Sequence, residues 1–419
     1  MKHEQGLKIK QVICAAGRSG YMHRDLMAIK SGAIADGGLY KGKALSPGFT
    51  RIVEPGTIIS VMFVLEDGQI AFGDCADVIL AGVAGRDPAF NSRDHIDYVR
   101  GEIADALRGR RVDEFRPNAE AMDRFVRGGK PLHTAIRYGV TQALLHATAL
   151  SHRQTMTEVI AREYGSTIAT EPIPILASCH KDDHGQLDRV ILKRVELLPH
   201  ASFQIVADHV GLQGEKLLAF VRRVANRVKE IGDADYHPRI HVDLYGTLGE
   251  LFKMQIEPLA DYLGTLREAA GEYQLLVESP MIAPTQDEQL DKFRGLRDLL
   301  AKKGIDVGLI ADEWCNTLAD IRLFADRRAA DFVQIKTPDL GGINNTIEAV
   351  LYCKSHGMGA CLGGTANETD QSTRISTHMG LACRPDFMLS KPGLGADEAL
   401  MIQTNEMART LALLQSRAT

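Results

Sequence analysis

Acidic residues end three segments that otherwise have the apolar character of buried strands: Asp243, Glu278 and Asp312. Buried parallel strands are normally continuous apolar runs, and an isolated buried charge is costly, so these carboxylates need a partner or a metal ion. Oxygen ligands without accompanying cysteines suit Mg²⁺ or Mn²⁺. The pattern therefore predicts a metal site, although strand alternation leaves open whether Asp312 or Glu313 faces it. Solvated carboxylates paired with Lys or Arg are the alternative.

A fourth strand-like segment ends in Gln334-Ile-Lys336. Gln334 and Lys336 are two residues apart, so their side chains project to the same face of a strand. Burial and a nearby divalent cation both disfavour an ammonium group, so we expect the pKa of Lys336 to fall toward neutrality, as a general base requires. The alternative is a structural lysine that neutralises the three carboxylates.

Two histidine motifs offer competing metal sites. His180 and His184 are four residues apart with two carboxylates between them, a composition that also fits a solvated loop. His241 and Asp243 form an H-x-D pair, which is typical of metal-dependent amidohydrolases with a barrel fold and would bind Zn²⁺. That class needs further histidines at strand ends, which the sequence does not place. The glycine pairs that begin at Gly341 and Gly363 are predicted to be tight turns, because no Lys-Ser/Thr pair follows them.

The segments that would position these residues alternate strand and helix from about residue 172 onward. Eight strands with crossovers over roughly 220 residues are typical of a (β/α)8 TIM-type barrel, whose strands end at one functional rim. An open doubly wound sheet is less consistent, because no G-x-G-x-x-G motif follows the first strand. The expected strands are Ile173–Ala177, one segment between Val195 and Val206, Ile240–Tyr245, Gln274–Glu278, Val307–Asp312, Phe332–Lys336, Gly359–Gly363 and Phe387–Leu389.

The first 165 residues have a different pattern. Two β-favouring runs, 58–66 and 69–73, surround Asp67-Gly68 and predict a hairpin, with 8–15 as a third antiparallel strand. Helical periodicity follows at about 92–109 and 132–163. Strands first and helices afterwards predict an α+β domain over residues 1–165, followed by the barrel over 166–419.

Composition restricts the class of protein. The 419 residues carry 49 Lys and Arg against 54 Asp and Glu, a net charge of −5, which argues against nucleic-acid and anionic-membrane binding. The longest apolar run, Ile58 to Leu65, is too short to span a membrane, and no apolar leader segment follows the N-terminus. Seven cysteines without a C-x-x-C pair favour free thiols. We therefore expect a cytoplasmic protein.

Several longer motifs are similar to those of the 3-methylaspartate ammonia-lyase family of the enolase superfamily. The resemblance runs over nearly the whole chain and is densest at 66–69, 73–76, 85–88, 132–139, 214–218, 311–317, 333–342 and 391–393. It implies an N-terminal domain that caps the barrel, a homodimer, and reversible loss of ammonia from 3-methylaspartate to give mesaconate. The resemblance therefore implies a small dicarboxylate or amino-acid substrate, and it allows a monovalent cation as an additional cofactor.

The resemblance also implies roles for individual residues. Mg²⁺ would be held by Asp243, Glu278 and Asp312, which resolves the choice between Asp312 and Glu313. Lys336 would remove the C3 proton, and His200 would act as acid or base on the opposite face. The C3 proton is barely acidic, so its removal needs the metal to stabilise the enolate of the adjacent carboxylate.

Five further positions match the substrate contacts implied by the resemblance. Gln334, Thr365 and Leu389 agree with the family pattern. Ser178 stands where the pattern has Gln, and Ala366 stands where it has Cys.

Ile79, on the capping domain, stands where the pattern has another Gln. The resemblance implies that these three positions face the ammonium and α-carboxylate end of the substrate, so the departures should weaken recognition there by about 1–3 kcal/mol for each lost buried hydrogen bond. His200 has its own ambiguity. Propensity predicts 203–206 as the second barrel strand, whereas the resemblance places the strand at 195–199, with His200 at its carboxyl end.

Three other functions remain open from the sequence. A related dehydratase would keep the deprotonation and eliminate water from a 2-hydroxy diacid such as 2-methylmalate. A metal-dependent amidohydrolase would use His241 and Asp243. A barrel that binds carbohydrate or protein without catalysis would leave Lys336 without a role.

Overall fold

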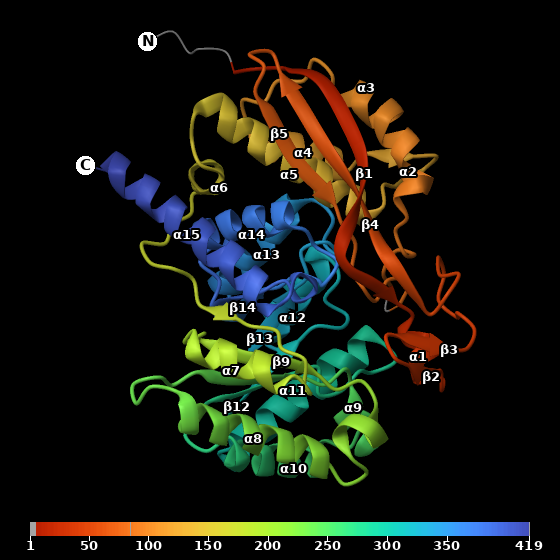
Figure 1. Cartoon of the computed structure of the whole chain (residues 1–419), viewed down its shortest axis with the longest axis vertical. Helices are drawn as coiled ribbons and strands as arrows, with labels where there is room; N and C mark the ends of the chain where they lie inside the picture. Colours follow the sequence, from red (N-terminus) through yellow and green to blue (C-terminus); the bar gives the residue numbers. More distant parts are fainter. Residues whose placement is uncertain (1–5, 84, 419) are drawn as a thin grey trace.

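The computed structural model describes residues 6–83 and 85–418, and the predicted absence of a leader segment concerns residues 1–5, which lie outside this part. A three-stranded antiparallel sheet of order β1-β4-β5 forms the centre of the N-terminal domain, and helices α2 to α5 lie beside it (Figure 1). The strands are β1 (Ile9–Arg24), β4 (Val53–Leu65) and β5 (Ile70–Cys75). Ile59 pairs with Ala16 on one side and with Cys75 on the other, which confirms the predicted hairpin and the third strand.

Short elements and helices complete this domain. The small strands are β2 (Ile34–Asp36), β3 (Leu39–Lys41), β6 (Val126–Arg127) and β7 (Lys130–Pro131). The helices are α1 (Leu26–Lys30), α2 (Ser92–Tyr98), α3 (Ala104–Leu107), α4 (Phe115–Asp123), α5 (Thr134–His152) and α6 (Met156–Tyr164), with a π-helical segment, Val99–Ile103, between α2 and α3. One predicted helix, 132–163, is in fact two. The chain turns at Arg153, which has a φ of 53°, and Thr155 then caps α6 in a capping box with Glu158.

Eight parallel strands in the described part of the chain form a closed barrel below this domain (Figure 1). They are β8 (Ile175–Leu176), β9 (Leu197–Ser202), β10 (Arg239–Asp243), β11 (Leu275–Glu278), β12 (Val307–Ala311), β13 (Phe332–Ile335), β14 (Gly359–Leu362) and β15 (Phe387–Leu389). The predicted (β/α)8 barrel with an N-terminal α+β domain is therefore confirmed.

Helices cover the outside of the barrel, because buried parallel strands need an apolar layer on both faces. They are α7 (His184–Leu192), α8 (Glu215–Ile231), α9 (Thr247–Leu251), α10 (Ile256–Ala269), α11 (Gln286–Lys303), α12 (Leu318–Arg327), α13 (Ile343–Ser355), α14 (Asp370–Cys383) and α15 (Ala396–Ala418). None of the helices in the described ranges has the length and apolar content needed to cross a membrane.

The N-terminal domain lies against the loops that follow the barrel strands. Arg86 pairs with Asp339 at 2.8 Å, and the hydroxyl of Thr141 accepts a hydrogen bond from the backbone of Ile343 at 3.0 Å. The backbone amide of Gly20, on β1, donates to the carbonyl of Glu368 at 3.1 Å. These contacts make the domain a cap on the carboxyl-terminal rim of the barrel.

Candidate active site

The three predicted acidic residues lie together on the barrel rim. Asp243 and Glu278 are the last residues of β10 and β11 and are register partners, and Asp312 follows β12 directly. Their exposed fractions are 2%, 1% and 2%. Glu313 is also buried, but it accepts a hydrogen bond from the hydroxyl of Ser279, whereas Asp312 contacts the amine of Lys336. The two neighbouring carboxylates therefore have different partners.

Burial without enough positive charge shifts the pKa values of these carboxyl groups. Burial, together with the charge of Glu278, raises the pKa of Asp243 well above its usual range. Burial also raises the pKa of Asp312 to about 7, although the ammonium of Lys336 opposes this shift. Oδ1 of Asp312 is buried and has no hydrogen-bond partner in the described structure. This donor set fits a divalent cation, which would supply the missing charge and use the free oxygen.

Lys336 follows β13 at the same rim, and its amine forms an ion pair with Asp312. Burial alone would lower the pKa of Lys336, but the Asp312 carboxylate outweighs burial and raises this pKa above its ordinary value. The direction is opposite to the fall in the pKa of Lys336 predicted from the sequence, but that prediction assumed a divalent cation beside the lysine. A cation bound to Asp312 would compete with the ammonium for this carboxylate, and that competition favours the neutral amine.

His200 lies inside β9, at an irregularity in the strand pairing. His241 pairs with Pro199 and Val242 with Ala201, so His200 is the extra residue of a bulge, and its φ is 47°. The bulge directs the imidazole into the barrel mouth, with Nδ1 3.4 Å from the hydroxyl of Ser178 and Nε2 3.7 Å from Glu278. The prediction of a strand at 203–206 is wrong, because β9 ends at Ser202.

His241 brings a second imidazole to Glu278. Its Nε2 lies 3.0 Å from Oε2 of Glu278, and its ring centre is 5.1 Å from that of His200. Burial would raise the pKa of Glu278, but the two neighbouring histidines lower it below its usual range. One ligand atom from each of His200, His241 and Glu278 lies within 4.8 Å of the others, so these three residues are an alternative metal-binding group. In the sequence, the H-x-D pair with Asp243 is the one signal that marked His241 as a candidate metal ligand.

Gln334 completes the polar rim. Its Nε2 lies 3.4 Å from both carboxylate oxygens of Glu278. A Cβ atom at Gly363 would lie 2.1 Å from Oε1 of Gln334, so the glycine pair after β14 makes room for this side chain.

A cavity of about 420 Å³ between the cap and the barrel brings the predicted site residues together. Lys336, His200, Gln334, Thr365, Ala366, Leu389, Ser178, Asp243, Glu278 and Ile79 all line it, and Asp312 lies behind Lys336. The hydroxyl of Thr365 accepts a hydrogen bond from the backbone of Ile79 at 3.1 Å. The structure thus places these residues in one site, while their roles stay predictions.

The cap contributes lining residues that no sequence motif indicated, among them Tyr21, Arg24 and Tyr40. They are close to the barrel only because of contacts between segments that are far apart in the chain. Among the described residues, the candidate metal group is His200, His241 and Glu278, and it includes neither the His180 and His184 pair nor the full set of Asp243, Glu278 and Asp312. Nε2 of His184 lies 3.4 Å from Arg223.

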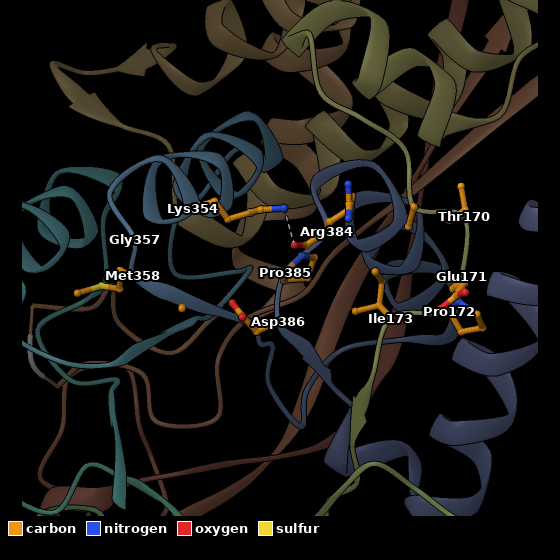
Figure 2. A pocket seen from close by; sticks show the side chains of 12 residues that line it. Thr170, Glu171, Pro172, Ile173, Lys354, Gly357, Met358, Arg384, Pro385 and Asp386 are labelled. Carbon is orange, nitrogen blue, oxygen red and sulfur yellow. Dashed lines mark hydrogen bonds between the residues drawn. The ribbon is translucent and has the colours of Figure 1, made fainter. Parts of the chain in front are cut away.

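A larger cavity, of about 550 Å³, lies at the opposite end of the barrel, beside the first residues of β14 and β15 (Figure 2). Its amine, Lys354, already donates hydrogen bonds to the carbonyls of Cys383 and Arg384 at 3.0 and 2.8 Å. This cavity holds none of the rim residues, so the chemistry lies in the smaller one.

Comparison with known proteins agrees over the full length. Family models described as methylaspartate ammonia-lyase N-terminus and C-terminus match residues 7–165 and 167–416. The chain is 47% identical to methylaspartate ammonia-lyase 2 of Carboxydothermus hydrogenoformans, over 98% of this chain and 99% of the relative. Among solved structures, it matches β-methylaspartase from Clostridium tetanomorphum in its magnesium complex with 45% identity and a TM-score of 0.92, over 98% of this chain and 100% of the other. It also matches the Citrobacter amalonaticus enzyme containing (2S,3S)-3-methylaspartic acid, with 44% identity and a TM-score of 0.94, over 97% and 100% of the two chains.

Proposed function

This chain belongs to the methylaspartate ammonia-lyase family, and from that premise we propose that it eliminates ammonia reversibly from 3-methylaspartate, or a close analogue, to give mesaconate. One observation carries most of the support. Lys336, which contacts the rim carboxylate Asp312, lines the same cavity as His200. A base and a second proton-transfer group therefore face one cavity beside a cluster of carboxylates.

The metal in this proposal is Mg²⁺, with Mn²⁺ as a possible substitute, held by Asp243, Glu278 and Asp312. A hard divalent cation prefers oxygen ligands, and these three buried carboxylates supply them. Two of them, Asp243 and Asp312, have raised pKa values, and Asp312 has one oxygen without a hydrogen-bond partner in the described structure. Once bound, the ion would stabilise the negative charge that develops on the substrate carboxylate next to C3.

The residues of the chain divide the remaining work. Nζ of Lys336, in its neutral form, takes the proton from C3. The imidazole of His200, on β9, serves the opposite face of the substrate. The amide of Gln334 holds the carboxylate that becomes the enolate, and Thr365, Leu389 and the backbone of Ala366 confine the rest of the molecule. Ser178, which lies beside His200, orients that imidazole.

Two alternatives have some support. A dehydratase acting on 2-methylmalate would use the same base and metal, and the altered residues Ser178, Ala366 and Ile79 leave the amino end of the pocket open to it. The group of His200, His241 and Glu278 has the donor atoms of a Zn²⁺ site. The full-length match to ammonia-lyases favours neither.

The deciding experiment compares 3-methylaspartate and 2-methylmalate as substrates in the presence of Mg²⁺, by the ultraviolet absorbance of the conjugated diacid and by ammonia release. We expect absorbance and ammonia from 3-methylaspartate. Lys336→Ala should lower kcat by about 10²–10⁴ because a general base is lost. Lys354→Ala, in the cavity at the other end of the barrel, is the matched control and should retain activity. Product without ammonia, or activity that requires Zn²⁺, would reject the proposal.

The predicted homodimer, the cytoplasmic location and a requirement for a monovalent cation stay predictions. Size-exclusion chromatography with light scattering tests the first. Replacing all monovalent metal ions by a large organic cation during the assay tests the last.

A further inference from the structure

One cation in the active-site cavity has no acidic partner. The cavity is lined by four Lys or Arg residues: Arg24, Arg86, Lys181 and Lys336. Arg86 pairs with Asp339 at 2.8 Å, Lys336 pairs with Asp312, and Lys181 lies 3.6 Å from Asp182. Within the described structure, Arg24 alone among these four forms no ion pair.

The guanidinium of Arg24 has hydrogen-bond donors to spare. Nη2 donates to the hydroxyl of Tyr21, and the guanidinium carbon lies 5.0 Å from the centre of that ring. Nε is buried and has no partner in the described ranges. An arginine has five N–H donors in a planar fork that matches a carboxylate, so most of the donors of Arg24 remain available. The adjacent Asp25 forms no ion pair with it in the described structure, and the oxygens of Asp25 accept hydrogen bonds from the backbone of Ala28, Leu45 and Ser46.

The position of Arg24 sets it apart from the proposed metal. Its backbone amide donates to the carbonyl of Ile79 at 2.8 Å, so it lies on the cap side of the cavity. The side chain of Ile79 belongs to an apolar cluster with Leu26, Leu80 and Tyr245. The carboxylates that line the cavity in the described part of the chain, Asp243 and Glu278, lie on the barrel rim. Arg24 on the cap and the carboxylates on the rim therefore bring opposite charges to the cavity from two different domains.

Space is also available on the cap side. Gly37 and Gly38 line the cavity between β2 and β3, and a Cβ atom at either would meet no atom within 4 Å. The total of about 420 Å³ falls in the range of pockets that hold drug-sized ligands, roughly 300–1,000 Å³. A four-carbon diacid would therefore leave part of this space unfilled.

We propose that Arg24 is a specificity-determining residue, which binds the second acidic group of a dicarboxylate substrate at the cap end while the first is held at the rim. This inference rests on the proposed function for the identity of the rim end. What it adds is the residue: it assigns the preference for diacids over monoacids to Arg24 on the cap. A guanidinium that pairs with a carboxylate discriminates between the two classes of acid, because a monoacid leaves the charge of the guanidinium unpaired.

The test measures equilibrium binding rather than turnover, by titration calorimetry in the presence of Mg²⁺. The probes are pairs of equal carbon number: succinate and butyrate, glutarate and valerate, adipate and hexanoate. We expect Arg24→Gln to lower the affinity for at least one diacid by about tenfold or more. The affinity for the monoacid of equal carbon number should change less than about twofold. Arg24→Lys should lie between wild type and Arg24→Gln, because it keeps the charge and loses the fork.

Arg18→Gln is the control variant, since Arg18 lies on the same strand, is exposed and does not line the cavity. It should bind every probe as wild type does, and thermal unfolding should show that both glutamine variants are folded. Equal loss of diacid and monoacid, or no loss at any length, overturns the inference. Because binding is read without catalysis, failure to release ammonia from 3-methylaspartate rejects the proposed function and leaves this result intact. The diacid that loses most affinity gives the length of the substrate.

Discussion

A fully buried ion pair beside the active site should dominate the stability of the barrel rim. Lys391 and Glu368 are both 0% exposed and lie 3.0 Å apart, and Lys391 also donates to the carbonyl of Gly363 at 2.7 Å. Glu368 accepts hydrogen bonds from the backbone of Thr365 at 2.8 Å and from the hydroxyl of Thr337 at 3.1 Å. It also accepts one from the hydroxyl of Tyr138, on cap helix α5. One carboxylate thus joins three barrel loops to the cap.

The contacts set the size of each expected effect. Breaking a buried pair costs about 3–5 kcal/mol, because an uncompensated charge remains inside. Lys391→Met leaves the Glu368 carboxylate with three donors, so we expect a loss near the lower end, about 3 kcal/mol. Glu368→Gln leaves Lys391 with the Gly363 carbonyl as its acceptor and places an amide against two hydroxyl donors, so we expect about 4–5 kcal/mol.

Urea-induced unfolding at neutral pH measures these free energies. The double variant Lys391→Met with Glu368→Gln removes both charges together and should cost clearly less than the sum of the two single variants. Arg108→Met is the control, since Arg108 and Asp105 are 57% and 68% exposed and such a pair contributes about 1 kcal/mol at most. Single losses below about 1 kcal/mol, or an additive double variant, would refute the reasoning.

Three further perturbations test other parts of the molecule. Burial, with the charge of Lys181, lowers the pKa of His209 to about 4, below its ordinary value near 6.5. As the pH falls, the unfolded state therefore binds the proton first, and stability present above pH 6.5 is lost as the pH falls toward 4. For this half-buried group we expect the free energy of unfolding to fall by about 1 kcal/mol between pH 7 and 4.5, measured by urea unfolding. This loss should be absent in His209→Asn. Gly139→Ala should destabilise by more than about 2 kcal/mol, because its Cβ would lie 2.3 Å from the backbone nitrogen of Cys75 in β5, whereas Gly101→Ala, which meets no atom within 4 Å, should be neutral or stabilising in the same assay. Mg²⁺ at about 100 times its Kd should stabilise the protein by about 2.7 kcal/mol in thermal unfolding, and a gain that persists in Asp243→Asn would contradict the proposed ligand set.

The sequence predicts the barrel well, because its signals are local. β15 spans the predicted residues, Phe387–Leu389, and β11 and β12 differ from their predictions by one residue at one end. The division of the predicted helix 132–163 also had a local signal, the Thr155 and Glu158 of a capping box, that apolar periodicity alone does not register.

Other parts of the site depend on long-range contacts. Propensity favoured 203–206 as a strand, but β9 ends before it and includes the bulge that orients His200. Which of the two acids at 312 and 313 meets Lys336 also depends on a neighbouring strand. The place of Arg24 in the cavity arises from the docking of the cap, and neither composition nor periodicity encodes that docking.

The alternation of side chains along the strands explains why one rim carries this chemistry. Leu276, Ile310 and Phe332 pack inside the barrel in an apolar layer. Glu278, Asp312 and Gln334 each come two residues later and so project to the same inner face one level higher. The apolar layer excludes water from below and keeps the local dielectric low, which raises the pKa values of unpaired carboxyl groups and strengthens every contact with a cation. The same strands that close the core therefore create the charge deficit that a metal ion and Lys336 can fill.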